Sequence, residues 1–228
     1  MHEKKFDLRN IEEEIMEVLF DITINKEMKQ RIKMGEILDK LDQDIAKTQL
    51  TNIVRRKLEP RGYVDYTPYD GILLTKLGYQ VARRIARNHR LAEAMLYQIF
   101  DVPFSELHEQ ACYLEHGISD RLAEIIFKKL KDKKTPFGDI IPMGDVEDLG
   151  CDDQNLVDIP TGNIVILTRI SSHSTETIKE LESYQIHEID TKIVVKDRDT
   201  EGVSVEINNT EYKIPSHLSK ILCVKPEK

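Results

Sequence analysis

Apolar residues recur every three or four positions through most of the first 130 residues, as they do on one face of an α-helix. In the first such stretch they are Ile11, Ile15, Val18, Leu19 and Ile22. The same spacing predicts helices over residues 8–24, 35–41, 48–59, 75–100, a stretch after Ser105, and 119–130. This part of the chain is therefore predicted to be mainly helical.

Two serines stand where helices are predicted to begin, because a serine hydroxyl accepts a hydrogen bond from a backbone N–H of the first turn. Ser105 is predicted to cap the helix that carries His108, and Ser119 the helix that follows it. The residues of that last helix predicted to face inward are Leu122, Ile125, Ile126 and Leu130. These helices hold more apolar surface than they can bury alone, which predicts a homodimer interface, or else a covering second domain.

Strand patterns occur at two places in the chain. Short apolar runs at 62–64 and 72–74 flank the turn Tyr69-Asp70-Gly71, which predicts a β-hairpin. From Ile164 onward the β-rich runs are NIVIL, KIVVK, VSVEI, EYKI and KILCV, separated by turn residues. Five or six short strands in about seventy residues are typical of a small β-barrel. The acidic, glycine-containing stretch before them resembles a linker, with a simple surface loop as the alternative.

The helix predicted at 48–59 has a polar and basic face opposite its apolar one. Two short helices, a turn between them and a following hairpin form the plan of a winged helix-turn-helix, although such helix pairs are also common as plain packing units. Amide and guanidinium groups are suited to base edges and phosphates. The predicted DNA-contacting residues are Lys47, Thr48, Gln49, Thr51, Asn52, Arg55 and Arg56.

Charge is unevenly distributed along the chain. The formal net charge is −8, yet residues 26–90 alone carry +7 and the remainder −15. A local basic block supports nucleic-acid binding, with a solvated helical surface as the alternative. Three widely spaced cysteines, no apolar leader and no run of about eighteen apolar residues predict a cytoplasmic protein with reduced thiols and no membrane partner.

The stretch from residue 89 to 116 concentrates side chains that can bind metals. On a helix, residues three or four apart share a face, so two helices would each present a stripe of donors. The candidate ligands are His89, Glu93, His108, Cys112, Glu115 and His116. Nitrogen, oxygen and sulfur together suit zinc or another later first-row divalent ion better than calcium or magnesium. The alternative is that these are ordinary surface and core residues.

Three motifs carry a resemblance to a known family. The runs HRLAE (89–93), HEQACYLEHGISD (108–120) and TPFGDIIP (135–142) resemble those of the iron-dependent, diphtheria-toxin-repressor-like metalloregulators. The resemblance implies an α+β fold with three parts: an N-terminal winged helix-turn-helix, an α-helical dimerisation domain and a C-terminal SH3-like small β-barrel. The expected bounds are 1–74 for the winged helix, 75–142 for the metal-binding and dimerisation domain, 143–158 for a linker, and 159–228 for the SH3-like, ferrous-transport-protein-A-like domain.

The resemblance also implies two metal sites. His89, Glu93 and His108 match an ancillary site, and Cys112, Glu115 and His116 match a primary, activating site. A further primary ligand is expected from the first helix, where Glu13 fits the family pattern and Glu12 and Met16 are rivals. Some members complete the ancillary site from the β domain. Here the matching positions fall near Ser172 and Thr175, which are not equivalent ligands, so His173 or Glu176 substitutes or the contact is absent.

The function implied is a transcriptional repressor switched on by a divalent metal, binding double-stranded operator DNA as a homodimer and repressing metal-uptake genes. The thiolate of Cys112 favours Fe²⁺ over Mn²⁺, with Co²⁺, Ni²⁺ or Zn²⁺ able to substitute. The alternatives are a manganese-responsive or broader divalent-metal sensor, and a winged-helix regulator whose metal site is purely structural. An enzyme acting on a small-molecule substrate is not expected, because HEQAC lacks the second histidine of HExxH and no other catalytic motif accompanies it.

Overall fold

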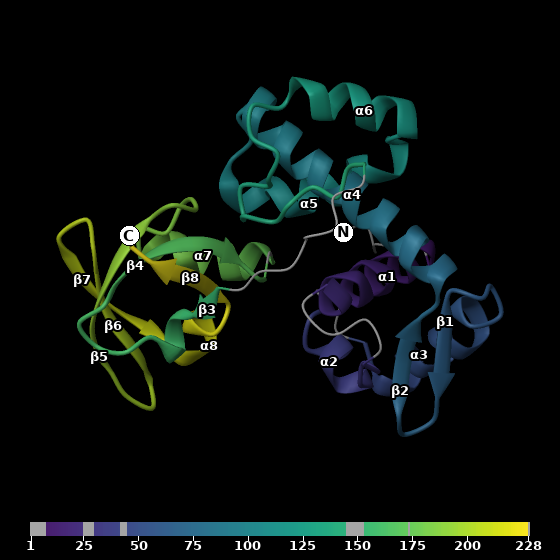
Figure 1. Ribbon diagram of the computed structural model, residues 1–228, viewed down its shortest axis with the longest axis horizontal. Coiled ribbons are helices and arrows are strands. Elements are labelled where there is room, and N and C mark those ends of the chain that lie inside the picture. Colours follow the sequence, from purple (N-terminus) through teal and green to yellow (C-terminus); the bar gives the residue numbers. More distant parts are fainter. Residues whose placement is uncertain (1–7, 25–29, 42–44, 145–152, 173, 228) are drawn as a thin grey trace, which may run out of the picture. The chain divides into compact units, whose positions relative to one another are not determined.

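The computed structural model describes residues 8–24, 30–41, 45–144, 153–172 and 174–227, and Figure 1 labels their helices and strands. The chain divides into two compact units, Met1–Asn88 with Pro142–Gly150, and His89–Ile141 with Cys151–Lys228. One long helix, α4 (Lys76–Phe100), contributes to both units.

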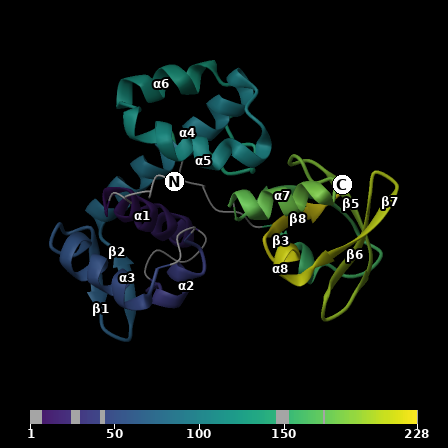
Figure 2. The same cartoon turned by 180° about the vertical axis from the view of Figure 1, so that it is seen from behind.

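The first unit is a winged helix-turn-helix. Its elements are α1 (Leu8–Ile24), α2 (Met34–Leu38), α3 (Lys47–Ile53), η1 (Val54–Leu58), β1 (Val64–Thr67) and β2 (Gly71–Leu74), followed by the start of α4 (Figure 2). The first helix has the predicted bounds. The helix predicted at 48–59 is divided, because its second half is the π-helical turn η1, which is wider than an α-helical turn and is often found at functional sites.

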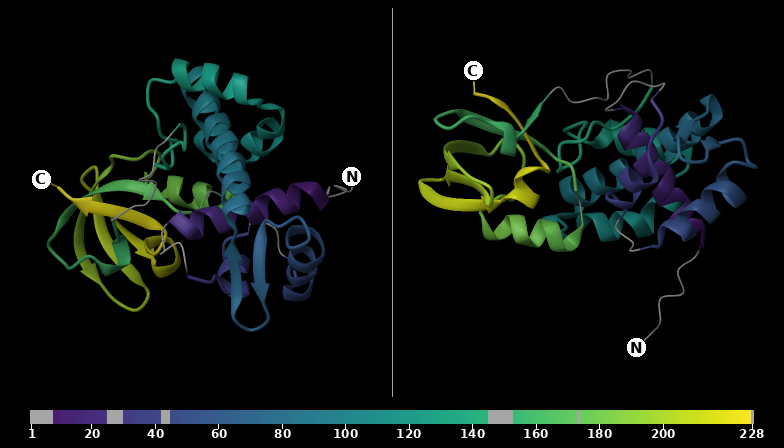
Figure 3. Two further views of the ribbon diagram at one scale, coloured as in Figure 1. Left: turned by 45° about the vertical axis from the view of Figure 1, so that its right-hand side comes forward. Right: turned by 90° about the horizontal axis from the view of Figure 1, so that it is seen from below.

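The predicted hairpin is confirmed. β1 and β2 are antiparallel, with Val64 opposite Leu74 and Thr67 opposite Gly71 (Figure 3). Ile32 forms an isolated antiparallel β-bridge with Ile72, through two backbone hydrogen bonds of 2.8 and 2.9 Å. The hairpin is therefore tied to the chain before α2.

The apolar faces predicted for the first unit meet in one core. Its side chains from α1, α3, η1 and β2 that are at most 1% exposed are Ile15, Leu19, Phe20, Leu50, Val54, Leu58 and Ile72. Burying each such side chain contributes about 1.5–3 kcal/mol. This core holds the polar face of α3 outward, because the apolar and polar faces of one helix are opposite each other.

α4 confirms the long helix predicted at 75–100. Near its start, Gly78 lies so close to the preceding chain that an added Cβ would be 1.7 Å from the Tyr63 carbonyl oxygen. Only a residue without a side chain fits this approach between the helix and the base of the hairpin. Among the described helices, α4 included, none combines the length and apolar composition needed to cross a lipid bilayer.

The helical part of the second unit continues from α4 through η2 (Phe104–Glu106), α5 (Leu107–Leu114), η3 (Glu115–Gly117) and α6 (Asp120–Lys129). The cap at Ser119 is confirmed, because its Oγ accepts a 3.2 Å hydrogen bond from the Leu122 N–H. The cap at Ser105 is wrong. Ser105 lies inside the short 3-10 turn η2, so Glu106 occupies the position before α5 and makes no side-chain cap.

The inward face predicted for α6 is only half correct. Ile126 and Leu130 are buried, whereas Leu122 and Ile125 are each 41% exposed. The apolar stripe of α6 is wider than the surface that this single chain packs against it. An exposed stripe of this kind is typical of a helix that packs against a partner molecule.

The rest of the second unit is a six-stranded antiparallel sheet in the order β3-β8-β4-β5-β6-β7. Its strands are β3 (Gln154–Asn155), β4 (Ile164–Ile170), β5 (Lys192–Arg198), β6 (Gly202–Ile207), β7 (Thr210–Pro215) and β8 (Leu222–Pro226). The five predicted runs are confirmed as β4 to β8. Two short 3-10 and α-helical pieces, η4 (Leu156–Asp158) and α8 (Ser216–Ser219), complete the connections.

One helix of this domain was not predicted. α7 (Thr175–Ser183) runs alongside the sheet, as the right-hand view of Figure 3 shows. Ser174 begins it, since the Ser174 Oγ accepts a hydrogen bond from the Thr177 N–H at 3.3 Å. Ile178 and Leu181 are its buried residues. A serine followed by apolar residues at helical spacing was the signal available in the sequence.

We expect Gly78→Ala to lower the free energy of unfolding by about 1–3 kcal/mol, because the new methyl group would overlap the Tyr63 carbonyl oxygen. The matched control is Gly35→Ala in α2, where an added Cβ has no described atom within 4 Å. That change should be neutral or stabilising, since alanine favours helices over glycine by about 1 kcal/mol. Urea unfolding measures both; equal effects of the two variants would contradict the close approach.

Candidate metal centre and DNA-binding surface

The first pair of candidate ligands is buried on α4. His89 and Glu93 are four residues apart, so they share one face of the helix. Their exposed fractions are 2% and 0%, and the His89 Nε2 lies 3.0 Å from the Glu93 Oε1. Burying a carboxylate and an imidazole is costly unless each meets a partner. The two groups meet that requirement for each other.

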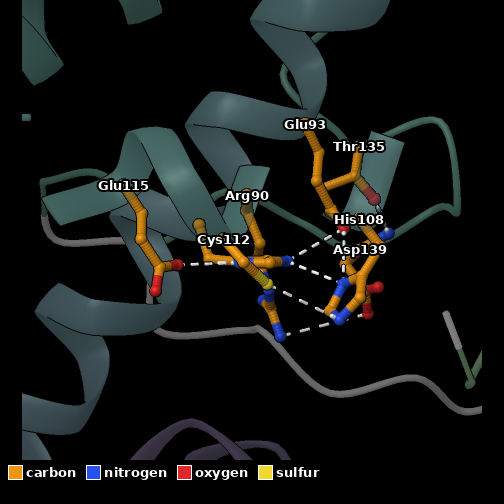
Figure 4. Close-up of polar contacts among 8 residues, drawn as sticks. Arg90, Glu93, His108, Cys112, Glu115, Thr135 and Asp139 are labelled. Carbon is orange, nitrogen blue, oxygen red and sulfur yellow. Dashed lines mark hydrogen bonds and ion pairs between the residues drawn. The ribbon is translucent and has the colours of Figure 1, made fainter. Parts of the chain in front are cut away.

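The helix α5 brings two more donors to this pair (Figure 4). The His108 Nδ1 lies 3.0 Å from the His89 Nε2 and 3.4 Å from the Glu93 Oε1. One turn later, the Cys112 Sγ lies 3.8 Å from the His108 Nε2. Four candidate ligands from two helices thus form one cluster.

Glu115 extends the cluster from the other side of His89. Its Oε2 lies 2.7 Å from the His89 Nδ1, so both ring nitrogens of this histidine face carboxylate oxygens. Glu115 and His116 stand in the tight turn η3, where α5 ends. The His116 Nε2 lies 3.7 Å from the Glu115 Oε1, and His116 is exposed.

The donor set fits a divalent metal ion. One ligand atom each from His89, His108 and Cys112 lies within 4.8 Å of the other two. Bonds of 2.0–2.3 Å around a tetrahedral ion place its ligand atoms about 3.3–3.8 Å apart, so a small closure of the cluster suffices. Two nitrogens and a sulfur match zinc and the later first-row ions. Because His89 touches residues of both predicted sets, the division into primary and ancillary sites stays a prediction.

The surroundings also favour the ionised thiol of Cys112. Burial of the thiol opposes ionisation, but hydrogen bonds and charge interactions with His108 and His89 outweigh it, so the pKa of Cys112 is lowered. A thiolate is the form that binds metals. The cluster is thus arranged to hold its sulfur in the ligand form at a lower pH than an ordinary cysteine.

A second layer of contacts, not predicted from the sequence, supports the cluster. Arg90 follows His89 on α4, is 2% exposed, and donates a 2.7 Å hydrogen bond from Nη1 to the Ile140 carbonyl oxygen. Its Nη2 lies 4.0 Å from the Asp139 Oδ1, which is 3.6 Å from the Arg169 Nη1 of β4. Figure 4 shows Arg90 and Asp139 beside the donors. The only feature of the sequence that pointed to these contacts was the charged residue Asp139 within the TPFGDIIP motif.

The first-helix candidates differ in their surroundings within the first unit. The Arg61 Nη1 donates a hydrogen bond to the Glu12 Oε2, so the Glu12 carboxylate is paired with an arginine. Met16 is 2% exposed, and Glu13 is half-buried on α1. Glu13 remains the predicted ligand from this helix.

The β-domain candidates lie around the start of α7. Ser172 is half-buried, Thr175 is the first residue of the helix, and Glu176 is exposed. His173 lies outside the described residues. A ligand from this domain therefore stays a prediction, as does its absence.

The predicted DNA-contacting residues lie on α3 and η1, and the structure exposes all of them except Thr51, which is half-buried. Two have local roles as well. The Gln49 Oε1 accepts a 2.9 Å hydrogen bond from the Ala46 N–H, and the Thr51 hydroxyl donates to the Lys47 carbonyl oxygen at 2.7 Å. Lys57, which was not predicted, is exposed with Arg55 and Arg56 on η1.

Comparison with known proteins places these features in a family. Residues 75–143 match the family model described as the iron dependent repressor, metal binding and dimerisation domain. An uncharacterized helix-turn-helix-type transcriptional regulator of Methanocaldococcus jannaschii is 36% identical over 111 residues, 47% of this chain and 86% of that protein. The diphtheria toxin repressor of Corynebacterium diphtheriae is 26% identical over 184 residues, 80% of this chain and 75% of that protein.

Solved structures share the fold. A manganese-dependent transcriptional repressor in complex with manganese superposes with a TM-score of 0.80 at 22% identity, covering 95% of this chain and 100% of that chain. The crystal structure of T. acidophilum IdeR gives a TM-score of 0.74 at 18% identity, covering 94% of this chain and 97% of that chain. These matches confirm the predicted α+β architecture of winged helix, helical dimerisation domain and SH3-like β domain.

A winged helix-turn-helix in a chain with a buried cluster of histidine, cysteine and glutamate donors defines a DNA-binding protein of the metal-sensing class. The family model over residues 75–143 and the Methanocaldococcus jannaschii relative, matched over 86% of its length, identify the family within this class. The chain belongs to the iron-dependent, diphtheria-toxin-repressor-like family of metalloregulators.

We expect the thiol of Cys112 to ionise with a pKa below the ordinary 9.0, and His108→Ala to raise that pKa. The physical reason is the loss of the hydrogen bond that favours the thiolate. The ultraviolet absorbance of the thiolate can be followed against pH in a Cys151→Ser/Cys223→Ser background, where Cys112 is the single thiol. Gln110→Ala, an exposed change on the same helix, is the control; an unchanged titration in His108→Ala would refute the assignment.

Proposed function

We propose that this chain is a divalent-metal-dependent transcriptional repressor that binds operator DNA as a homodimer and controls metal-uptake genes. The observation that carries the proposal is the convergence of the buried His89 with the half-buried His108 and Cys112, in a chain that also presents a winged helix-turn-helix. Family membership supports it, since several relatives are described as iron-dependent repressors. We infer a regulatory rather than a catalytic role, in the cytoplasm.

For the effector we propose Fe²⁺. Cys112 supplies a soft sulfur donor, which favours iron and later ions over manganese. The structural relatives include proteins described as manganese-dependent, so a manganese-responsive or broader sensor is the second candidate. Co²⁺, Ni²⁺ and Zn²⁺ are expected to substitute in vitro because their affinities follow the Irving–Williams order.

We assign Cys112, Glu115 and His116, with Glu13 of α1, to the activating site, and His89, Glu93 and His108 to the ancillary site. A bound ion would supply a cross-link between the helix that begins the winged domain and the helices of the dimerisation domain. The residues themselves contribute affinity: the donors are gathered by α4 and α5, and Arg90 and Asp139 fix the backbone around His89. Donors held in place need less reorganisation when they bind an ion.

The proposed dimer interface includes the exposed apolar stripe of α6. Leu122 and Ile125 are both 41% exposed. At the end of α5, Tyr113 is 59% exposed and Leu114 is 41% exposed. Apolar side chains gathered on neighbouring helices favour an isologous contact between two copies. A two-fold dimer presents two α3 helices to DNA half-sites about one helical turn, or a multiple of one turn, apart.

We expect Cys112→Ala to reduce the metal-dependent gain in operator affinity while leaving the dimer intact. An allosteric coupling of about 1–3 kcal/mol corresponds to a five- to 150-fold gain in affinity, most of which should be lost. Fluorescence anisotropy of operator DNA should be measured anaerobically with chelator, Fe²⁺ and Mn²⁺ at fixed salt, because phosphate contacts make affinity salt-dependent. Sedimentation measures the dimer.

Cys223→Ser, a thiol change in β8, serves as the control for that experiment. A larger gain with Fe²⁺ than with Mn²⁺ in the unmodified chain supports iron, and equal gains support the broader sensor. Unchanged metal dependence in Cys112→Ala would remove this residue from the activating site. No response to any metal, on DNA that the protein binds, would leave a winged-helix regulator with a structural metal site.

The residues of α3 and η1 should divide between base reading and phosphate binding. Asn52→Ala is expected to reduce discrimination between operator and mismatched sites by about 1–3 kcal/mol, since an exposed amide can pair with a base edge. Arg55→Ala should weaken binding to all sequences and lower the slope of log affinity against log salt by about 1. Titrations on operator and unrelated DNA at several salt concentrations separate the two effects. Equal losses for Asn52→Ala on both DNAs would rule out base reading by this residue.

A further inference from the structure

One loop of the second unit, residues 135–141, lies between the metal-carrying helices and the β domain. Its backbone is closed on itself by two hydrogen bonds. The Thr135 N–H donates to the Asp139 carbonyl oxygen at 2.9 Å, and the Asp139 N–H donates to the Thr135 hydroxyl at 3.1 Å. Both residues are buried. The 135–141 loop therefore has a defined shape, and a contact made on one of its sides can be felt on the other.

On one side, the loop contacts both helices that carry donors. Arg90 of α4, the residue after His89, donates its 2.7 Å hydrogen bond to the Ile140 carbonyl oxygen. Phe137 is fully buried, and its ring centroid is 4.8 Å from that of Phe104, in the turn η2 directly before α5. The loop thus bridges α4 and the start of α5. Because the donors of the cluster come from these two helices, their spacing sets the distances between the donors.

On the other side, the strand β4 contacts the loop. The Ile170 N–H donates a 2.8 Å hydrogen bond to the Phe137 carbonyl oxygen. The Arg169 Nη1 lies 3.6 Å from the Asp139 Oδ1, in an ion pair whose side chains are 16% and 7% exposed. Water and salt screen such a pair less than one at the surface. The same carboxylate lies 4.0 Å from Arg90, so it stands between an arginine of β4 and an arginine of α4.

The closest approach of the loop to β4 is at Gly138. Its φ is +96°, and an added Cβ would lie 2.1 Å from the Thr168 carbonyl oxygen. A glycine is required here for its backbone conformation and for the space it leaves. The loop and β4 are therefore in backbone contact at the position next to the ion pair.

We propose that β4 sets the metal affinity of the cluster by holding the 135–141 loop, with Arg169 as the positioning residue. This inference rests on the proposed function, in which His89 and Glu93 of α4 bind one ion together with His108 of α5. A held loop keeps the two helices at a fixed spacing, so the donors need less reorganisation when they bind. Once β4 releases the loop, part of the binding free energy is used to restore that spacing. This action needs no ligand from the β domain.

The test is a titration of the full chain with Co²⁺, without DNA, in competition with a fluorescent chelator. Arg169→Gln should weaken Co²⁺ binding by about tenfold, the lower end of the effects usual for residues around a metal site. Arg169→Lys keeps the charge and should recover most of the affinity. The control is Arg198→Gln, which removes an exposed arginine from β5 of the same domain and should leave the affinity unchanged.

A second variant tests the same contact without changing a charge. Gly138→Ala places a methyl group against the Thr168 carbonyl oxygen and should weaken Co²⁺ binding at least as much as Arg169→Gln. Gly162→Ala is its matched control, because Gly162 has a φ of +87° but no described atom within 4 Å of an added Cβ. The combined loss in Arg169→Gln/Gly138→Ala should be smaller than the product of the single losses, since both changes release one loop.

The titration also separates positioning from a merely structural role. Loss of positioning raises the dissociation constant at unchanged stoichiometry. A structural defect lowers the number of chains able to bind and leaves the dissociation constant of the folded chains unchanged. An unchanged dissociation constant in Arg169→Gln, or no recovery in Arg169→Lys, would overturn the inference. These two variants decide the question even where Gly138→Ala fails to fold.

Failure of the proposed function gives a different result. His108→Ala removes a donor and should abolish one class of Co²⁺ site. If Co²⁺ binding to the chain does not depend on His108, the proposed ancillary site is wrong. If binding depends on His108 and is the same in Arg169→Gln and Gly138→Ala as in the unmodified chain, only the present inference fails.

Discussion

Both ring nitrogens of one buried histidine contact carboxylate oxygens, and the candidate metal centre is built around this arrangement. The His89 Nδ1 faces Glu115 and the His89 Nε2 faces Glu93 and His108. A carboxylate can only accept hydrogen bonds, so two carboxylates on one imidazole suit a ring that donates from both nitrogens. A metal ligand must instead present a bare nitrogen. An ion at the proposed site would therefore take the place of one of these carboxylate contacts on the His89 ring.

That exchange gives the cluster two arrangements from the same side chains. Without an ion, hydrogen bonds and charge pairs among Glu93, His89 and Glu115 satisfy groups that would be costly to bury alone. An ion held by the proposed site would use the same donors. The free energy of binding it would then be the difference between the two arrangements. Arg90 hydrogen-bonds to the Ile140 carbonyl oxygen and lies 4.0 Å from Asp139, contacts that do not require an ion.

Much of this could be predicted from the sequence, because it depends on local spacing. His89 and Glu93, or His108 and Cys112, are four residues apart, and helical periodicity alone places each pair on one face. The cap at Ser119 likewise depends on neighbours in the chain. Ser105 failed as a cap because a 3-10 turn and an α-helix begin with nearly the same residues, and only packing of Phe104 and Leu107, both buried, fixes where each starts.

The remaining features depend on residues distant in sequence. The contact of His89 with Glu115 joins positions 26 residues apart, and the ion pair of Glu12 with Arg61 joins positions 49 apart. No periodicity encodes which carboxylate meets which cation. Leu122 and Ile125 were predicted to be buried because an apolar stripe indicates burial but does not specify whether the covering surface belongs to the same chain. The sequence also left three rival ligands on the first helix, and it did not indicate that one of them, Glu12, pairs with Arg61.

Hydrogen bonds within α3 also limit how the winged helix can read DNA. The side-chain carbonyl oxygen of Gln49 accepts a hydrogen bond from the Ala46 N–H at the start of the helix, and the Thr51 hydroxyl donates one to the Lys47 carbonyl oxygen. A glutamine bound in this way retains its N–H₂ group as a donor but cannot make the bidentate pair with adenine, which needs both atoms of the amide. Under the proposed function, the bidentate pair with a base is then left to the exposed Asn52. Arg55 and Arg56 lie on the π-helical turn that follows α3, which is wider than an α-helical turn, so the residue proposed to read bases and the residues proposed to bind phosphates stand on two different helical segments.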